Sequence, residues 1–144
     1  MLTAAVLGAS WATLQCFRLL YAKHRRIDTA PFSHAEPTPA RRFLIVGDST
    51  GVGIGSVDSR STVAGRLAAA FPGTVIVNHA RDRARSFDIP AQIATSTGRF
   101  DLILILVGAN DVTRFSSYQA VLVAAEHALD VAGSCSDHVA VVPP

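Results

Sequence analysis

Four short apolar runs alternate with longer stretches of helical pattern, and this alternation limits the folds open to the chain. The first run, 43–46, reads Phe-Leu-Ile-Val without a break, which is typical of a strand that helices cover on both faces. The elements predicted in chain order are strand 43–46, helix 61–71, strand 74–78, helix 86–97, strand 102–107, a helix from Ser116 or Ser117 to about Ala132 that Gly133 ends, and strand 138–142. The sequence therefore predicts an α/β domain with a parallel, doubly wound sheet.

Composition excludes several functional classes. The 144 residues are enough for one domain with a sizeable core, and 49% of them are hydrophobic. A net charge of +2 gives no overall signature of a nucleic-acid-binding protein. The two cysteines, Cys16 and Cys135, lie in different settings, and no spacing of Cys and His resembles a zinc site. We therefore expect no metal, no cofactor and no nucleic-acid partner.

The N-terminal part of the chain, residues 1–22, is mostly apolar. A helix over Leu2–Tyr21 would be about 30 Å long, which matches the hydrocarbon core of a bilayer. The basic run 23–26 follows it, so the positive-inside rule predicts a membrane anchor with the domain on the cytoplasmic side. A poorly ordered or amphipathic N-terminal helix is the alternative. Residues 23–42 contain three prolines and are interpreted as a linker, which leaves 43–144 as the domain.

Polar residues follow two of the predicted strands at the point where each strand ends. Segment 47–49 reads Gly-Asp-Ser after the first strand, and segment 108–111 reads Gly-Ala-Asn-Asp after the third. The carboxyl ends of parallel strands meet at one edge of a sheet, so we expect a serine hydroxyl and an asparagine amide to lie close together. Gly-Asp-Ser by itself is typical of an ordinary turn. The second segment, in a matching context, favours a functional site.

Ser49 and Asn110 have the chemistry of an acyl-transfer site. A serine nucleophile needs an exposed hydroxyl, a base and donors for the oxyanion. The backbone N–H of Ser49 and the side-chain amide of Asn110 could serve as donors, and Gly47 permits a sharp exit from the strand. Asp48 and Asp111 could orient the two loops by hydrogen bonding.

These segments, in this order and at this spacing, resemble the first and third sequence blocks of the SGNH/GDSL hydrolase family. That family comprises esterases, lipases and acylhydrolases of flavodoxin-like, three-layer α/β/α fold, and the resemblance runs from about Phe43 to the end of the chain. It implies that Ser49 is the nucleophile and an oxyanion donor, and that Asn110 is the oxyanion-hole asparagine. Asn78 matches the asparagine of the second block, and Gly108 belongs to the third block. The resemblance also implies ester hydrolysis of a small-molecule substrate.

The chain departs from the second block of the family at one position. Arg83 stands where the family has a glycine whose N–H is the other oxyanion donor. If that position needs a positive φ, arginine is strained there. Two readings of the nearby Arg81, Arg83 and Arg85 stay open, since they could favour an anionic substrate or form a solvated loop surface.

A second departure concerns the base. The last family block is Asp-x-x-His, and no such sequence follows Asn110. His79 and His127 lie elsewhere in the pattern, and Asp137-His138 stand at the start of the last predicted strand. The chain thus reads as the first two-thirds of a hydrolase, without the last strand and the catalytic block. We expect weak or no activity from it alone, and an uncovered apolar strand 138–142.

Two other functions remain open at this level. One is an SGNH-like interaction domain without catalytic activity, which the missing base favours. The other is a phosphate- or nucleotide-binding module that uses the glycine-rich segment 47–55. That segment contains neither Gly-x-Gly-x-x-Gly nor a Walker lysine. The predicted function is therefore ester hydrolysis by a serine nucleophile.

Overall fold

The sheet of the computed structural model, which describes residues 30–142, is parallel throughout. In this part of the chain it has four strands, which are β1 (Arg41–Gly47), β2 (Thr74–Asn78), β3 (Leu102–Leu106) and β4 (Val139–Val142). Their order across the sheet is β2–β1–β3–β4. This is the order of the first four strands of a flavodoxin-like sheet, in which the topological switch point lies between β1 and β3. The predicted fold class is confirmed.

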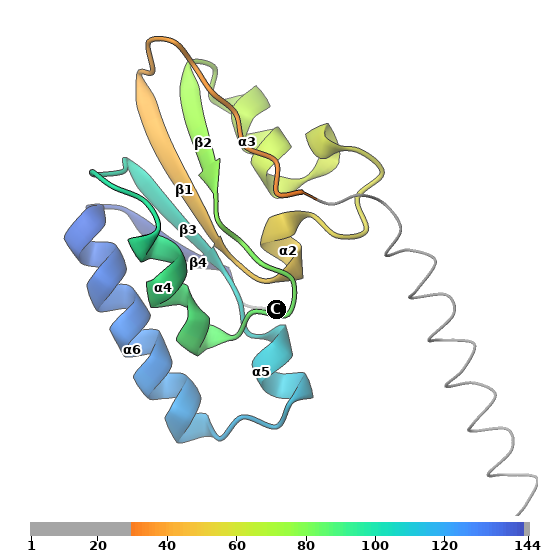
Figure 1. The fold of residues 1–144 in the computed structure, drawn as a ribbon, viewed down its shortest axis with the longest axis vertical. Coiled ribbons are helices and arrows are strands. Elements are labelled where there is room, and N and C mark those ends of the chain that lie inside the picture. Colours follow the sequence, from red (N-terminus) through yellow and green to blue (C-terminus); the bar gives the residue numbers. More distant parts are fainter. Residues whose placement is uncertain (1–29, 143–144) are drawn as a thin grey trace, which may run out of the picture.

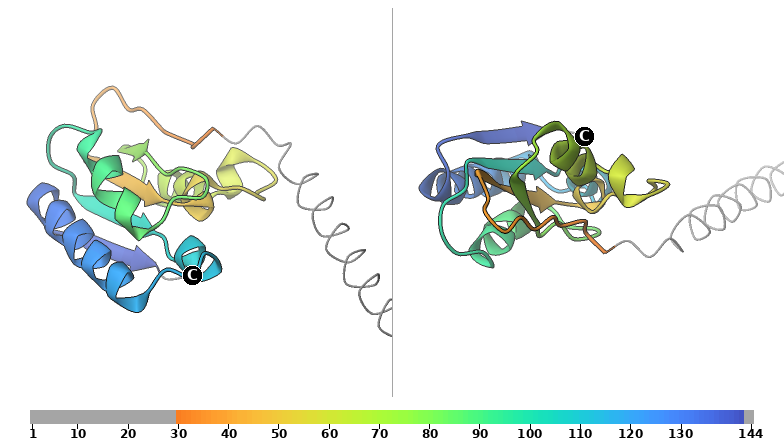
Figure 2. Two further views of the ribbon diagram at one scale, coloured as in Figure 1. Left: turned by 60° about the horizontal axis from the view of Figure 1, so that its bottom comes forward. Right: turned by 90° about the horizontal axis from the view of Figure 1, so that it is seen from above.

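Helices cover both faces of this sheet (Figures 1 and 2). The helices and 3₁₀ turns are α2 (Ser49–Val52), η1 (Ser59–Ser61), α3 (Val63–Ala70), η2 (Ser86–Asp88), α4 (Ile89–Ala94), α5 (Ala109–Thr113) and α6 (Tyr118–Cys135). On one face, Val63 and Leu67 of α3 pack against a buried cluster that includes Ile45 and Ile76. On the other face, a second cluster joins the sheet to α4 and α6 through Ile93 and residues such as Ala128. The result is a three-layer α/β/α domain.

The strand register brings the predicted functional segments together at the carboxyl end of the sheet. Gly47 of β1 lies opposite Leu106 of β3, and Ile45 lies opposite Asn78 of β2. The residues that follow these three strands therefore emerge side by side. Figure 1 shows α2, the loop after β2 and α5 gathered at this carboxyl end of the sheet.

Most element boundaries agree with the prediction to within a few residues, but the prediction for the end of α6 was wrong. Gly133 does not end this helix, which continues to Cys135 and is followed by Ser136 as its C-cap. Ala124, Ala128 and Ala132 lie buried along one face of α6, so packing on the sheet carries the helix past the glycine. Helix 86–97 is also shorter than predicted, since it begins as the 3₁₀ turn η2 and ends at Ala94.

The described residues before β1 lie against the outer edge of β2. Phe32 packs on the cluster under α3, and His34 pairs with Ile76 in both directions through N–H and C=O at 2.9 Å. The division into residues 1–22, 23–42 and 43–144 stays a prediction, and the predicted anchor 2–21 lies outside the described residues. Within residues 30–142, no helix is long and apolar enough to cross a bilayer.

Strand β4 is the edge strand of the sheet on the side opposite β2. Among the described residues it pairs with β3 alone, in parallel register from Val139 to Val142. Val141 and Val142 are 52% and 45% exposed, although both belong to a run of four apolar residues. The strand predicted to be uncovered is thus exposed in the part of the chain that the structure describes.

Candidate active site

Ser49 is the first residue of α2 and lies two residues beyond the end of β1. The Asp48 carboxylate caps this short helix by accepting the N–H of Thr50 at 2.9 Å, and Asp48 is 2% exposed. The Asp48 N–H donates to the Leu106 carbonyl of β3, also at 2.9 Å. Ser49 itself is half-buried, and its hydroxyl makes no hydrogen bond to any residue in 30–142. The strand exit and the helix cap therefore fix the serine backbone while the hydroxyl stays uncommitted.

Gly47 allows the close approach of β1 to β3 at this exit. Its φ is +147°, and a Cβ built on it would lie 2.0 Å from the Leu106 carbonyl oxygen. The side chain of Gln92, which is fully buried on α4, binds both backbone groups of Gly47. Its Oε1 accepts the Gly47 N–H at 2.7 Å, and its Nε2 donates to the Gly47 carbonyl at 3.0 Å. A side chain 45 residues away thus positions the residue two before Ser49.

Sequence reasoning missed Gln92. A signal was present, because Ile89, Gln92 and Ile93 have the i, i+3, i+4 spacing of one helix face. A single amide on an apolar face is expected to have a specific hydrogen-bond partner, since burying it unpaired is costly. The sequence could not show which partner this was.

Asn110 lies in the first turn of α5, four residues beyond the position of β3 that pairs with Gly47. Gly108 precedes the helix with a φ of +134° and turns the chain toward the sheet edge. The Asn110 Nδ2 donates to the Ala84 carbonyl at 3.1 Å, and the residue is half-buried. An amide nitrogen carries two hydrogens, so one remains for another acceptor. Ser49 and Asn110 therefore follow adjacent strands at the switch point, the usual ligand site of such sheets.

The loop after β2 crosses between these two residues. The Arg81 N–H donates to the Gly47 carbonyl at 3.0 Å, and Ala84 accepts the Asn110 amide. Arg83 lies between these anchors with a φ of +65°, so the positive φ considered for this position from the sequence is present, with an arginine in the left-handed region that glycine favours. Within the described residues, the Arg83 N–H has no hydrogen-bond acceptor.

Asn78 and Asp111 brace the loops around Ser49 and Asn110. Asn78 donates to the Gly51 carbonyl of α2 at 2.9 Å and accepts the Ala80 N–H at 3.1 Å. The Asp111 carboxylate accepts the Ser86 N–H at 2.9 Å and the Ser86 hydroxyl at 2.8 Å. Asn78 and Asp111 are both buried, with their polar atoms satisfied inside the domain. Asn78 and Asp111 therefore bind backbone groups of the surrounding loops and helices, and they do not offer free groups to a ligand.

The glycine-rich segment 47–55, weighed above as a phosphate cradle, has a packing explanation. A Cβ on Gly51 would lie 2.7 Å from the Ala80 Cβ, and one on Gly53 would lie 2.3 Å from the Thr62 Cγ2. These glycines let α2 approach the loop after β2 and the cap of α3. Nothing in this geometry supports phosphate binding. Among residues 30–142, no three His, Cys, Asp or Glu side chains converge as metal ligands would.

Comparison with solved structures identifies the fold. A lipolytic protein of the G-D-S-L family from Veillonella parvula DSM 2008 matches with a TM-score of 0.60 at 18% identity, over 71% of this chain and 57% of that one. AlinE4, an SGNH-hydrolase family esterase, matches with a TM-score of 0.62 at 19% identity, over 76% and 60%. This chain has the SGNH-hydrolase fold. A catalytic mutant of Axe2, an acetylxylan esterase from Geobacillus stearothermophilus, also matches, with a TM-score of 0.56 at 20% identity, over 76% and 62%.

At these identities the likeness concerns the fold. The chain spans 57 to 62% of the length of the three structures just described. No protein-family model matches the sequence, and the search of curated proteins found no match. The resemblance stated from the segments 47–49 and 108–111 is thereby confirmed at the level of the SGNH-hydrolase fold.

No histidine among residues 30–142 hydrogen-bonds to Ser49 in this SGNH-type domain. Asn78 contacts α2, whereas the next residue, His79, turns to α4 on the other face. Its Nδ1 lies 3.0 Å from the Gln92 carbonyl oxygen and also contacts Thr95 Oγ1. The other described histidines are His34, beside Glu36, exposed His127 on α6, and exposed His138 at the amino end of β4. The structure thus brings Ser49 and Asn110 to one edge without bringing a base to them.

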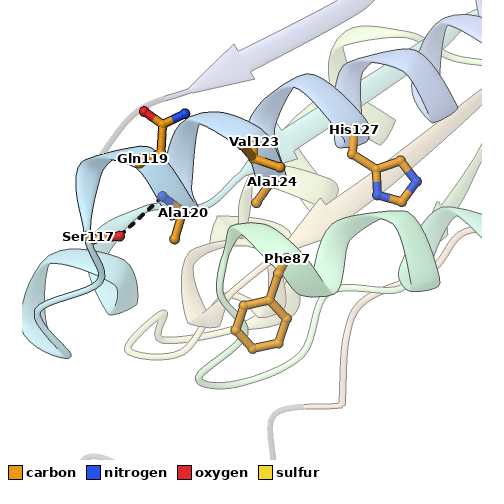
Figure 3. A pocket seen from close by; sticks show the side chains of 7 residues that line it. All are labelled: Phe87, Ser117, Gln119, Ala120, Val123, Ala124 and His127. Atoms are coloured by element: carbon orange, nitrogen blue, oxygen red, sulfur yellow. Dashed lines mark hydrogen bonds between the residues drawn. The ribbon is translucent and has the colours of Figure 1, made fainter.

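A cavity of about 580 Å³ lies between η2 and α6 (Figure 3), and none of the predicted site residues lines it. The residues that line it are Phe87, Ser117, Gln119, Ala120, Val123, Ala124 and His127. A second cavity, of about 470 Å³, includes Gly108 and Asp111 in its lining, together with Val141 of the exposed strand β4. Neither cavity is lined by Ser49 or Asn110.

We predict that Arg83→Gly raises the free energy of unfolding by about 0.5–1 kcal/mol, because glycine adopts a φ of +65° without the strain that a Cβ causes. Urea denaturation followed by circular dichroism measures the change. Arg81→Gly is the matched control, since this exposed arginine of the same loop has a negative φ and should become less stable on substitution. Equal destabilisation by both variants would show that Arg83 is not strained.

Proposed function

We propose that this chain carries the nucleophile and the oxyanion donors of a serine ester hydrolase. The observation that supports this most directly is the placement of Ser49 and Asn110 after adjacent strands at the switch point of an SGNH-type sheet. In this proposal Ser49 is the nucleophile, and the Ser49 N–H, the Arg83 N–H and the free Asn110 amide hydrogen stabilise the oxyanion.

The reaction would proceed by acyl transfer. The Ser49 oxygen attacks the ester carbonyl carbon, its proton passes to a base, and the carbonyl oxygen becomes the oxyanion. Collapse of this intermediate expels the alcohol, and water then releases the acid and regenerates the serine. Donors placed where the negative charge develops stabilise the transition state more than the substrate.

Among residues 30–142 no base adjoins Ser49, and this determines the activity that we expect. A serine hydroxyl without a neighbouring base stays protonated at neutral pH, and removal of a triad member leaves only oxyanion-hole and binding effects. We therefore expect turnover of p-nitrophenyl acetate by the 144-residue chain to exceed the buffer rate only slightly. Small-molecule esters are the proposed substrate class, in keeping with the esterase and lipolytic names of proteins that share the fold.

A labelling experiment with an added base tests the assignment. We predict that a fluorophosphonate probe forms an adduct at Ser49, at a rate that rises with imidazole concentration because imidazole supplies the base that no described residue provides beside Ser49. Ser49→Ala should abolish the adduct. Asn110→Ala should slow it by about 10²–10³-fold, the usual effect of removing one oxyanion donor. Peptide mapping by mass spectrometry measures both results.

Ser56→Ala provides the control for that experiment, since Ser56 is a half-buried serine on the loop that follows α2. Its labelling rate should equal that of the unmodified chain. Labelling that persists in Ser49→Ala would identify a different nucleophile. A normal rate in Asn110→Ala would remove the amide from the oxyanion hole.

We also propose, from the sequence of residues 2–26, that the N-terminal segment associates with a membrane and leaves the domain in the cytoplasm. An alkaline phosphatase fusion after Arg42 is expected to be inactive and to sediment with membranes, because this phosphatase is active only after export. High phosphatase activity would reverse the orientation. Recovery of the fusion in the soluble fraction would contradict the association itself.

A further inference from the structure

Three exposed arginines surround the edge that carries Ser49 and Asn110. Arg81 and Arg83 belong to the loop after β2, and Arg114 follows α5. The loop is anchored at both ends, through the Arg81 N–H on the Gly47 carbonyl and through the Ala84 carbonyl on the Asn110 amide. It therefore runs across the carboxyl edge of the sheet, from the exit of β1 to the start of α5.

Arg114 approaches the same edge from α5. Its backbone N–H donates to the Asn110 carbonyl at 3.2 Å, so it is one helical turn beyond the asparagine. Residues four apart on a helix share a face, which places the Arg114 side chain on the Asn110 face of α5. Asn110 thus has one arginine beside it on the loop after β2 and another at the C-cap of its own helix.

The carboxylates at this edge offset only part of the positive charge of these arginines. Asp48 and Asp111 are buried and accept hydrogen bonds from Thr50 and Ser86 inside the domain. Asp82, half-buried on the loop, forms an ion pair with Arg83, with 3.6 Å between its carboxylate and the Arg83 Nε. The positive charge of Arg81, Arg83 and Arg114 therefore exceeds the negative charge of Asp82, the one of these three carboxylates that is partly open to solvent.

Arg85, the remaining arginine of the loop, is engaged differently. Its guanidinium lies 4.3 Å from the centre of the Phe87 ring, in a cation–π contact. Its backbone N–H donates to the Asp88 carboxylate at 2.8 Å. Arg85 thus braces the loop, whereas the side chain of Arg83 is 59% exposed on it.

The backbone at Arg83 adds a second observation. A φ of +65° is strained for arginine and relaxed for glycine, so a large cationic side chain stands where the local conformation favours no side chain. A guanidinium binds a carboxylate or phosphate through paired, charge-assisted hydrogen bonds. Strain of this kind at a candidate site is consistent with a use for the side chain.

We infer that the site accepts an ester that carries an anionic group, a carboxylate or a phosphate, and that Arg83 and Arg114 bind this group. The inference rests on the proposed function, because it treats Ser49 as the reacting group. Of the two roles open to the arginines, a solvated surface or an anion-binding one, this assigns anion binding to Arg83 and Arg114, on either side of Asn110.

Titration of the ¹⁵N-labelled full chain in a neutral detergent tests this inference. The probes are monoethyl succinate, phenyl phosphate and the uncharged diethyl succinate. The Nε–H signals of Arg83 and Arg114 and the Asn110 amide signals should shift with at least one of the two anions and not with the diester. The anion that binds more tightly decides between carboxylate and phosphate. Equal shifts with the diester, or no shift with either anion, would overturn the inference.

Matched variants separate a site from general charge attraction. Arg83→Gln and Arg114→Gln should each weaken binding of the preferred anion by about tenfold, the loss of one charge-assisted contact. Arg41→Gln removes the same charge from an exposed position at the amino end of β1, the opposite edge of the sheet, and should change nothing. Equal weakening in all three variants would contradict the assignment.

Fluorophosphonate labelling of the same samples distinguishes the two possible failures. If Ser49 is labelled but the titration shows equal binding of the anions and the diester, the substrate class is wrong and the hydrolase proposal stands. Anion binding at Arg83 and Arg114 in a chain whose Ser49 resists labelling at every imidazole concentration would overturn the proposed function, and with it the claim that the bound anion belongs to an ester substrate.

Discussion

Gly47→Ala is expected to lower the free energy of unfolding by about 3 kcal/mol or more, because it combines a strained backbone with an overpacked contact. The φ of +147° disfavours any Cβ, and the added atom would lie 2.0 Å from the Leu106 carbonyl oxygen. That oxygen belongs to the neighbouring strand and also accepts the Asp48 N–H, so it cannot move freely. Urea denaturation measures the loss, and labelling of Ser49 should fall with it.

Two other glycines provide controls for Gly47→Ala. Gly55 has a φ of +92° with no atom within 4 Å of an added Cβ, so Gly55→Ala isolates the conformational cost, about 1 kcal/mol. Gly133 lies inside α6 with equally open surroundings, and Gly133→Ala should raise stability by about 0.5–1 kcal/mol. If Gly47→Ala cost no more than Gly55→Ala, the close approach of β1 to β3 would not constrain the strand exit.

Gln92→Ala should destabilise the domain by about 2–4 kcal/mol, because it leaves the buried Gly47 N–H without its acceptor and opens a cavity on α4. The lost bonds, of 2.7 and 3.0 Å, hold the residue that leads into Ser49, so we expect labelling of Ser49 to slow as well. Denaturant unfolding and the labelling rate at saturating imidazole provide the two measurements.

A charge variant and a surface variant sharpen this test. Gln92→Glu should be less damaging at pH 4 than at pH 7, since a protonated carboxyl can still donate to the Gly47 carbonyl and a buried carboxylate cannot. Gln119→Ala, at an exposed position of α6, should change stability by less than about 0.5 kcal/mol. A loss in Gln92→Ala no larger than in Gln119→Ala would show that the two bonds do not hold the strand exit.

The order of strands and helices could be predicted because its signals are local. An unbroken run such as 43–46 indicates a covered strand, and the glycines that follow two of the strands mark where the chain turns. The same locality explains why Ser49 and Asn110 were recognised as candidates, since each directly follows a strand. The end of α6 was misjudged at Gly133 because the buried alanines of that helix pack on residues distant in sequence.

The sequence by itself determined which elements form and which polar residues follow them. Only the tertiary structure decided what those residues touch. Three such contacts join segments far apart in the chain. Gln92 binds Gly47, and the loop between Arg81 and Ala84 links β1 to α5. His79 turns toward α4. Such contacts depend on which strands become neighbours, and strand pairing results from packing the whole sheet rather than from any local pattern.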